Sequence, residues 1–329
     1  MVWTGLVVGI LFGVVLQQGR ICFNSAFRDI ILIKDNYLLK LAAFALALMM
    51  LVFVLLSQFG LMVMNPKPLN VPANIIGGLL FGVGMVLAAG CASGTTYRVG
   101  EGLTTAWLAA LSYGLSGYAA KAGAFKWLPS ALSGSAVKVA QDPSYYVAES
   151  GPTIPSILGL NPWIPAVVIA ALLIWYAFGT KTTERETKLG WKLAAVLLAV
   201  IAGIAFVTSS MAGRKYGLGI TGGWINLFKG YVANEPLNWE GLEIIGIIIG
   251  SAVAAVWTKE FKLRMPKKPI TYVQVLIGGL LMGVGAVTAG GCNIGHFLTG
   301  VPQLAISSII ASICFVLGNW AMTWVLYRD

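Results

Sequence analysis

The sequence predicts an all-α polytopic membrane protein with broken or re-entrant helices and an inverted internal repeat. Three observations lead to this fold class. The 329-residue chain is 58% hydrophobic and only 10% charged, whereas soluble domains are about 25% charged. Apolar stretches long enough to cross a bilayer recur along the whole chain. One glycine-rich stretch that ends in Gly-Cys occurs twice. This composition disfavours secreted disulfide modules, disordered proteins and cytosolic nucleotide enzymes, because no soluble core absorbs so much apolar surface.

The transmembrane segments follow from the length of the apolar stretches. A helix that crosses the hydrocarbon layer needs about 20 mostly apolar residues. We expect about nine such segments, several of them short and glycine-rich: 2–18, 38–64, 71–90, 103–123, 161–179, 190–210, 240–257, 272–291 and 303–327. The stretch 121–160 carries lysines, acids and prolines, and we expect an external loop with short amphipathic pieces there. The first segment lacks a basic start and a cleavage site, so we expect it to be retained.

The basic residues indicate the orientation of the chain in the membrane. The net charge is +10, and most cations lie between apolar segments, where they set topology and do not form a nucleic-acid surface. With the N-terminus outside, the inside connections hold 15 of the Lys and Arg residues and the outside connections hold 7. The sequence therefore predicts a periplasmic N-terminus and a cytoplasmic C-terminus.

The chain repeats itself with an offset of 201 residues. Residues 76–91 read IGGLLFGVGMVLAAGC and residues 277–292 read IGGLLMGVGAVTAGGC, identical at 12 of 16 positions. A weaker match aligns Gly19 and Arg20 with Gly213 and Arg214. A shift of five crossings is odd, so the two halves have opposite orientation, as in many transporters. We predict one membrane domain over 1–329, which consists of half one (about 1–124), a connector with one span (about 125–189) and half two (about 190–329).

Each copy of the repeat ends in a sequence that breaks a helix. The breaks read GCASGT over 90–95 and GCNIGH over 291–296, and glycine-rich runs are poor helix formers. Non-helical backbone inside a membrane is tolerated where it lines a cavity or is buried in protein, and the N–H groups that begin the next helix attract anions. Small residues also let helices pack closely, and we assign that role to the glycines of the GGLLxGVG stretches. Packing alone does not explain why both copies end in Gly-Cys.

Three thiols lie at three of four related breaks. Cys22, in GRICFNSAFRD, follows the first span and corresponds to Tyr216, while Cys91 and Cys292 end the two repeats. A single membrane cysteine usually fills space, and we assign that role to Cys314. The thiols Cys22, Cys91 and Cys292 are the predicted transport pathway. Supporting candidates from the same breaks are Arg20, Asn24, Gly90, Ser93, Gly94, Thr95, Arg214, Tyr216, Gly291, Asn293, Gly295 and His296.

The ionisable candidates allow two interpretations each. Arg20 and Arg214 either draw an anion into each vestibule or anchor the chain at the interface. His296, the single histidine, is either a functional base or a hydrogen-bonded neighbour. Span interiors hold almost no acids, with Glu243 the main exception, which disfavours a carboxylate proton relay. No catalytic residue, metal or cofactor is expected, because the chain has no CxxC and no Cys/His cluster of zinc spacing.

These features resemble the YeeE/YedE family of bacterial inner-membrane sulfur transporters, and specifically its thiosulfate-uptake members. The resemblance rests on the Gly-Cys breaks at Cys91 and Cys292, the GRIC motif that ends at Cys22, and the nine apolar segments. It implies thiosulfate import for cysteine synthesis through an hourglass-shaped molecule with a narrow waist, and it maps the functional cysteines of the family onto these three. It also implies a small cytosolic sulfur-carrier partner of the TusA type. Other members handle other sulfur or selenium species.

The chemistry of thiosulfate suits a row of thiols. Thiosulfate is a divalent anion with one soft terminal sulfur, and a thiol is a weak donor that is polarisable enough to face it. Weak sequential sites let an ion enter and leave, and we expect the thiols to be neutral. An alternative is a membrane-embedded sulfurtransferase that takes the outer sulfur as a cysteine persulfide, which requires a base or cation beside the thiol. A scaffold subunit without transport is a further alternative, which the broken repeat disfavours.

Overall fold

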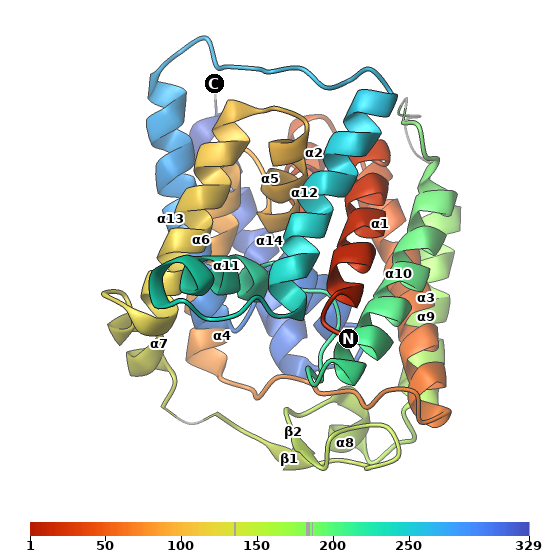
Figure 1. The fold of residues 1–329 in the computed structure, drawn as a ribbon. Helices are drawn as coiled ribbons and strands as arrows, with labels where there is room; N and C mark the ends of the chain where they lie inside the picture. Colours follow the sequence, from red (N-terminus) through yellow and green to blue (C-terminus); the bar gives the residue numbers. More distant parts are fainter. Residues whose placement is uncertain (135, 182–184, 186, 329) are drawn as a thin grey trace.

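The protein is a bundle of helices (Figure 1), and the computed structural model describes residues 1–134, 136–181, 185 and 187–328. A short antiparallel pair, β1 (Val139–Ala140) and β2 (Glu149–Ser150), lies in the loop between the sixth and ninth helices. The helices in chain order are α1 (Thr4–Gln18), α2 (Phe23–Leu32), α3 (Tyr37–Gln58), α4 (Val71–Leu87), α5 (Ala92–Gly100), α6 (Thr104–Ala122), α7 (Trp127–Leu132), α8 (Ile154–Leu158), α9 (Trp163–Gly179), α10 (Trp191–Met211), α11 (Thr221–Ala233), α12 (Trp239–Trp257), α13 (Ile270–Ala289), the π-helical η1 (Ile294–Gly300) and α14 (Ile306–Leu326).

Hydropathy confirms an all-α polytopic membrane protein. Within the described residues, seven segments are long and apolar enough to cross a membrane: Thr4–Leu32, Tyr37–Gln58, Val71–Gly100, Trp191–Met211, Trp239–Trp257, Ile270–Ala289 and Ile306–Leu326. The two remaining predicted spans are also helical. However, α9 has only 17 residues, and α6 is less apolar because it carries hydroxyl side chains and Lys121. A helix is thus present at each of the nine predicted segments.

Two of the predicted segments have different boundaries in the structure. The segment expected over 38–64 is shorter, because α3 ends at Gln58 and Gly60 adopts a left-handed φ of 67°. Residues 59–70 then run across one end of the molecule as a strap. The segment expected over 303–327 begins as α14 only at Ile306, after η1 and a turn. The loop expected over 121–160 does contain short pieces, among them α7 and α8.

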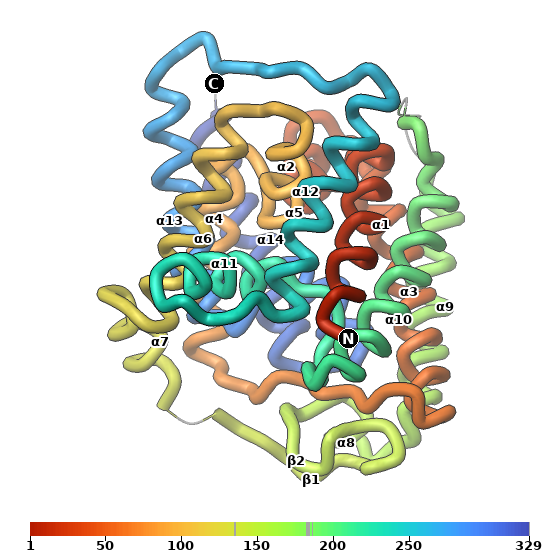
Figure 2. Tube along the Cα trace, viewed as in Figure 1, coloured from red at the N-terminus to blue at the C-terminus, as the bar shows by residue number. Residues whose placement is uncertain are grey.

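Two corresponding connections between helices cross opposite ends of the molecule. Figure 2 shows the strap 59–70 between α3 and α4 at the end that also carries β1, β2 and α8, which we call the loop end. The corresponding strap 258–269, between α12 and α13, crosses the opposite end. The N-terminus lies toward the loop end and the C-terminus at the opposite end (Figure 1). Corresponding connections at opposite ends are what an inverted repeat produces.

Close glycine contacts between α4 and α13 confirm the inverted arrangement. A Cβ built at Gly77 would lie 2.7 Å from the carbonyl oxygen of Gly285, and one at Gly84 would lie 2.8 Å from that of Gly278. In the repeat, however, Gly77 corresponds to Gly278 and Gly84 to Gly285. The contacts thus pair each glycine with the counterpart of the other, as a two-fold axis between antiparallel helices requires. The boundaries of the halves stay a prediction, and residues 135, 182–184, 186 and 329 within them lie outside the described residues.

A second set of glycines packs each repeat helix against the long helix that follows the break of the other half. Gly78 and Gly82 of α4 contact α14, and Gly279 and Gly283 of α13 contact α6 in the same way. Cys314 is part of this contact, because its Cβ would lie 2.6 Å from a Cβ at Gly78. The predicted packing role of the GGLLxGVG glycines is therefore confirmed, and Cys314 has the space-filling role expected of it.

We expect Gly84→Val to lower the stability of the fold. The added Cβ would meet the backbone nitrogen of Met282 at 2.7 Å, and backbone cannot yield as a flexible side chain does. Overpacking of this kind costs about 1–3 kcal/mol. Thermal unfolding of the detergent-solubilised protein measures the loss. Gly179→Val is the matched control, because nothing lies within 4 Å of a Cβ there. Equal melting temperatures for the two variants would contradict the close α4–α13 contact.

Candidate functional site

The four predicted breaks are present, and each separates a long helix from a shorter one. The pairs are α1 and α2, α4 and α5, α10 and α11, and α13 and η1. A left-handed residue lies two positions before each thiol, namely Arg20 (φ 50°), Ala89 (φ 52°) and Gly290 (φ 92°). This conformation ends the first helix and turns the chain, so that each cysteine immediately precedes the next helix or its first turn.

Cys22 and Cys91 face each other at the N-termini of α2 and α5. Their Sγ atoms are 3.7 Å apart. The Cys91 sulfur also accepts backbone N–H groups from Phe23 and Gly94, each at 3.3 Å, and lies 3.4 Å from the Ser93 hydroxyl. Both cysteine side chains are buried. The thiols at the breaks after α1 and α4 are therefore in contact, and two backbone N–H groups donate to the sulfur of Cys91.

Gly94 makes this pair possible. A Cβ at this position would lie 2.6 Å from the Cys22 sulfur and 3.2 Å from the Cys91 sulfur. No side chain larger than hydrogen fits there without displacing a thiol. At the corresponding position in the second half, Gly295, nothing lies within 4 Å of a Cβ. The two glycines occupy equivalent places in the sequence but meet different surroundings.

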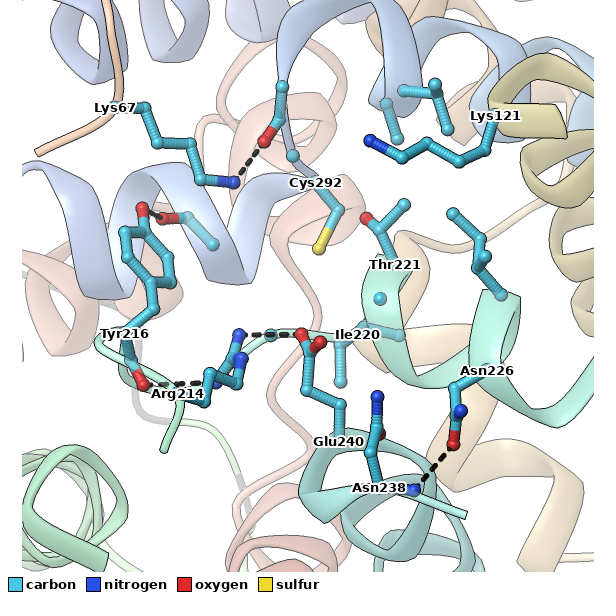
Figure 3. Close-up of a pocket in the computed structure, with 18 of the residues that line it drawn as sticks. Lys67, Lys121, Arg214, Tyr216, Ile220, Thr221, Asn226, Asn238, Glu240 and Cys292 are labelled. Carbon is cyan, nitrogen blue, oxygen red and sulfur yellow. Dashed lines mark hydrogen bonds and ion pairs between the residues drawn. The ribbon is translucent and has the colours of Figure 1, made fainter. Parts of the chain in front are cut away.

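Cys292 lies on the wall of a cavity. The cavity has a volume of about 550 Å³. It is formed by the strap 59–70, the loop before α11, the start of α12 and the break between α13 and η1. Figure 3 shows the Cys292 sulfur directed into it. Neither Cys22 nor Cys91 lines this cavity. Cys22 and Cys91 thus contact each other, and Cys292 is the thiol that lines the cavity.

The cavity is rich in positive charge. Its lining includes five basic residues and two acidic ones: Lys67, Lys121, Arg214, Lys215, Lys229, Glu235 and Glu240. Arg214 pairs with Glu240 at 2.6 Å, and Lys229 pairs with Glu235 at 3.1 Å. Among the described residues, the other three lysines have no carboxylate partner. Such a surplus of cations beside a thiol suits an anion with a soft sulfur.

Tyr216 contacts both the cations of the cavity and the break between α13 and η1. Its hydroxyl donates to the Gly295 carbonyl at 2.7 Å. The Lys67 Nζ lies 4.7 Å from the centre of its ring and the Arg214 guanidinium carbon 5.6 Å. The Lys67 ammonium also donates to the carbonyl of Gly290, as Figure 3 shows. Burial lowers the pKa of Lys67 to about 8, with the neighbouring Arg214 charge acting in the same direction. Tyr216 thus replaces the thiol at its break with a phenol that orders two cations.

His296 is held by hydrogen bonds at both ring nitrogens. Its Nε2 lies 3.1 Å from the carbonyl oxygen of Ala289, and its Nδ1 lies 3.0 Å from the Ser308 hydroxyl. A carbonyl only accepts, so Nε2 carries the proton. The imidazole is fully buried. Of the two interpretations, the hydrogen-bonded neighbour fits this geometry, because no ring nitrogen is left to act as a base on Cys292.

Arg20 lies at the opposite end of the molecule from Arg214. Its guanidinium pairs with Glu101 and, at 2.8 Å, with Glu260. It lines a smaller cavity of about 380 Å³ together with Gln18, Thr187, Lys188 and Glu260. Glu260 follows the C-terminus of α12, whereas Glu240, the partner of Arg214, lies in its first turn. The two matched arginines therefore form ion pairs at the two ends of α12, Arg214 at its N-terminus and Arg20 beyond its C-terminus.

The remaining predicted residues surround the breaks. Asn24 accepts a hydrogen bond from Asn319 at 2.7 Å, but its own Nδ2 has no partner among the described residues. Both amide atoms of Asn293 likewise lack a partner there, although the side chain is fully buried. Thr95 bonds only to carbonyls of its own helix. Gly90 and Gly291 contact Thr95 and Lys67 respectively. Buried amides without partners are donors and acceptors available to a polar ligand.

The sequence patterns missed the residues that complete the charged cavity. Lys67, Lys121, Asn226, Asn238 and Glu240 all line it, and Asn238 caps α12 by accepting from the Gly241 N–H at 2.9 Å. Four of these residues lie in connections or at helix ends, and Asn226 lies in the middle of α11. One sequence feature indicated Lys67, because a single lysine between two spans is unusual in a chain with so few charges.

Comparison with known proteins identifies relatives along the whole chain. The family described as "Sulphur transport" matches residues 18–321. The chain is 71% identical to "Thiosulfate transporter TsuA" of Spirochaeta thermophila over 330 residues, which cover all of both chains. It is 30% identical to "Thiosulfate transporter TsuA" of Escherichia coli K12, over 99% of this chain and 95% of that protein. It is also 40% identical to "Probable transporter YedE" of Escherichia coli K12, over 25% of this chain and 20% of that one.

Proposed function

Because this chain belongs to the sulphur transport family, we propose that it imports thiosulfate across the bacterial inner membrane for cysteine synthesis. The names of its two full-length relatives supply the substrate. The excess of Lys and Arg in the predicted inside connections supports a periplasmic N-terminus and a cytoplasmic C-terminus. In this orientation the loop end, with the charged cavity, faces the periplasm, and the Arg20 end faces the cytoplasm.

One observation carries the proposal: the cation-rich cavity that ends at the Cys292 thiol. A dianion entering from the loop end meets three lysines, none of which pairs with a carboxylate in the described part of the chain, and then the Cys292 thiol at the break after α13. The positive potential holds the charge of the anion. The thiol contacts its terminal sulfur. Sulfate offers similar charge but no soft end, so the cations contribute affinity and the thiol contributes discrimination.

The Cys22–Cys91 pair is the second binding site along the proposed transport route. Its sulfur atoms lie 3.7 Å apart at two helix N-termini. The Asn24 Nδ2 and both amide atoms of Asn293, which lack partners among the described residues, lie beside the breaks. Weak S–H contacts at each site let the anion bind and leave. Moving two negative charges inward against 100 mV costs about 4.6 kcal/mol. Delivery to a small TusA-like sulfur carrier in the cytosol would withdraw the anion at the inner end.

Uptake into proteoliposomes tests the proposal. Reconstituted protein should take up labelled thiosulfate with saturation, above protein-free liposomes, and unlabelled thiosulfate should inhibit more strongly than sulfate. In Cys292→Ser, which keeps a donor but removes the soft partner, inhibition by thiosulfate should weaken more than inhibition by sulfate. An unchanged ratio of the two inhibition constants would mean that size or charge, and not the thiol, distinguishes the anions.

The KM for thiosulfate should rise as the external pH passes upward through about 8. Lys67, whose pKa is lowered to about 8, carries its charge below that pH and loses it above. Loss of one nearby cation costs the bound dianion about 1.4 kcal/mol, or about tenfold in KM. In Lys67→Arg the cation persists at alkaline pH, so the rise in KM near pH 8 should be smaller than in the unaltered protein. A pH-independent KM in the unaltered protein would remove Lys67 from the binding site.

A further inference from the structure

Glu243 is a buried carboxyl group that the route of the anion does not use. It lies on α12, one turn after Glu240, and is fully buried. Its Oε1 accepts one long hydrogen bond, 3.4 Å from the backbone nitrogen of Gly219. Its Oε2 has no partner among the described residues. A carboxyl group this poorly satisfied is much costlier to bury ionised than neutral.

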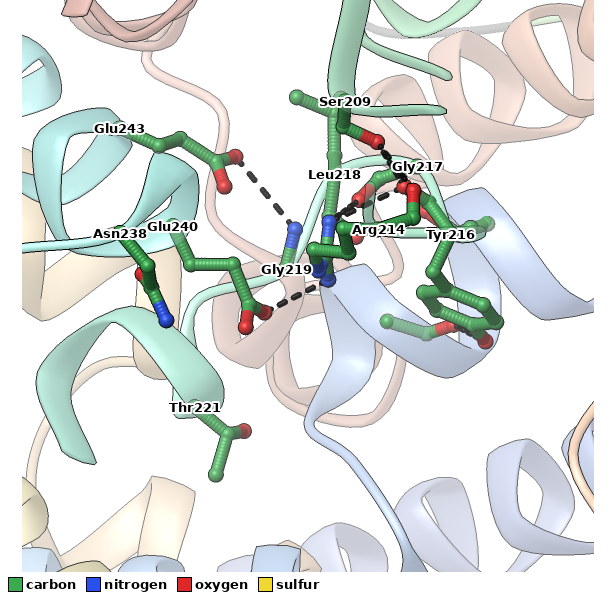
Figure 4. A network of polar contacts seen from close by, with 12 residues as sticks. Ser209, Arg214, Tyr216, Gly217, Leu218, Gly219, Thr221, Asn238, Glu240 and Glu243 are labelled. Atoms are coloured by element: carbon green, nitrogen blue, oxygen red, sulfur yellow. Dashed lines mark hydrogen bonds and ion pairs between the residues drawn. The ribbon is translucent and has the colours of Figure 1, made fainter. Parts of the chain in front are cut away.

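This carboxyl group lies directly behind the wall of the charged cavity. Gly219, its hydrogen-bond donor, lines the cavity together with Arg214 and Glu240. Figure 4 shows the Glu243 carboxyl directed toward Gly219, with the Arg214–Glu240 ion pair below it. A Cβ at Gly219 would lie 3.0 Å from the Arg214 guanidinium. One glycine residue therefore separates the carboxyl group from the site proposed for the anion.

Burial favours the neutral form of Glu243, and the charged groups near it act in both directions. Arg214 favours the ionised form, whereas Glu240 and a bound dianion favour the neutral one. The tightly packed α1 contributes no ionisable side chain over Thr4–Gln18. The other ionisable groups on elements packed against α12 are Tyr97 and Arg98 of α5, and Tyr231 and Lys229 of α11, the last of which pairs with Glu235. Cys292 lines the same cavity as Arg214 and Glu240.

We propose that Glu243 is the binding site of a proton that is co-transported with thiosulfate, an inference that rests on the proposed function. A dianion in the cavity strengthens proton binding to Glu243, and the bound proton in turn strengthens binding of the dianion, because such coupling is reciprocal. The proton enters from the outer solution with the anion and leaves at the inner end after it. One proton per anion reduces the net charge moved inward from two negative charges to one.

Simultaneous measurement of proton and sulfur entry tests this inference. Proteoliposomes loaded with a pH-sensitive dye receive labelled thiosulfate while potassium and valinomycin hold the membrane potential at zero. The unaltered protein should acidify the lumen by one proton per thiosulfate. An inside-alkaline gradient of one pH unit should raise thiosulfate accumulation about tenfold. Glu243→Gln should lose both effects, whereas thiosulfate counterflow, which needs no net proton movement, should continue.

Matched variants separate coupling from folding. Glu149→Gln, an exposed carboxyl of β2 outside both cavities, should keep both proton entry and the response to the gradient. Glu243→Asp, which keeps a titratable group, should retain proton entry if Glu243→Gln fails to fold. Thiosulfate entry without protons in the unaltered protein, or proton entry in a folded Glu243→Gln, would overturn the inference and leave the transport proposal intact. No thiosulfate entry above that of protein-free liposomes would instead overturn the proposed function itself.

Discussion

Cys91→Ala and Cys292→Ala should each reduce thiosulfate uptake to the background of protein-free liposomes, while both proteins still insert and elute as the unaltered protein does. The two thiols occupy equivalent positions in the repeat, but they have different surroundings and different proposed roles. Cys292 is the soft group at the inner wall of the cation-rich cavity. Cys91 is the acceptor on which two backbone N–H groups and the Cys22 thiol converge.

The physical reason for a large effect differs between the two sites. Alanine at position 91 leaves the buried N–H groups of Phe23 and Gly94 without an acceptor, at about 1–3 kcal/mol each, in addition to the lost contact with substrate. Alanine at position 292 leaves the cations in place, so thiosulfate should still bind in the cavity but not advance. Binding measured by calorimetry in Cys292→Ala, with uptake lost, would show this separation.

Cys314→Ala is the matched control, since this thiol packs between helices and lies at no break. It should keep its uptake. Cys22→Ser should lose less uptake than Cys91→Ser, because the Cys22 position tolerates a different polar group, Tyr216, in the other half of the repeat. Full uptake by the Cys91→Ala/Cys292→Ala double variant would refute the thiol pathway altogether.

Gly94→Ala should reduce uptake by about tenfold or more. The added Cβ would lie 2.6 Å from the Cys22 sulfur, so that thiol must move away from Cys91. Gly179→Ala, where a Cβ meets nothing within 4 Å, controls for the loss of a glycine. If the clash with sulfur is the cause, adding Cys22→Ala should restore the melting temperature but not the uptake. Unaltered uptake in Gly94→Ala would mean that the spacing of the pair does not matter.

The sequence was sufficient to predict the repeat, the four breaks and the packing glycines. These predictions depend on local patterns, because a Gly-Cys step that ends an apolar stretch breaks a helix wherever that helix is placed. The inverted topology also followed, since an odd number of crossings separates the copies. The α4–α13 glycine contacts then show the two-fold relation that the repeat implied.

The arrangement of the site was beyond the sequence because it depends on contacts between distant segments. Gly94 and Gly295 match in the repeat, yet only Gly94 lies against thiols. Cys22 and Cys91 are 69 residues apart and meet only because two broken helices begin at one point. His296 beside Cys292 suggested a base, but its ring nitrogens bond to Ala289 and Ser308. Lys67 lies in the strap 59–70, in the part that was predicted to be a connection between two spans.

The central claim is that thiosulfate passes the thiols as an intact anion, and isotope labelling tests it most directly. Proteoliposomes are given thiosulfate that carries one label on the outer sulfur and another on the oxygens, and both labels are counted in the lumen. Intact transport predicts that the two labels enter in the ratio at which they were supplied, from the first time point onward. Entry of the outer sulfur without the oxygens, or its retention on Cys91 as a persulfide, would contradict the account and identify the protein as a sulfurtransferase.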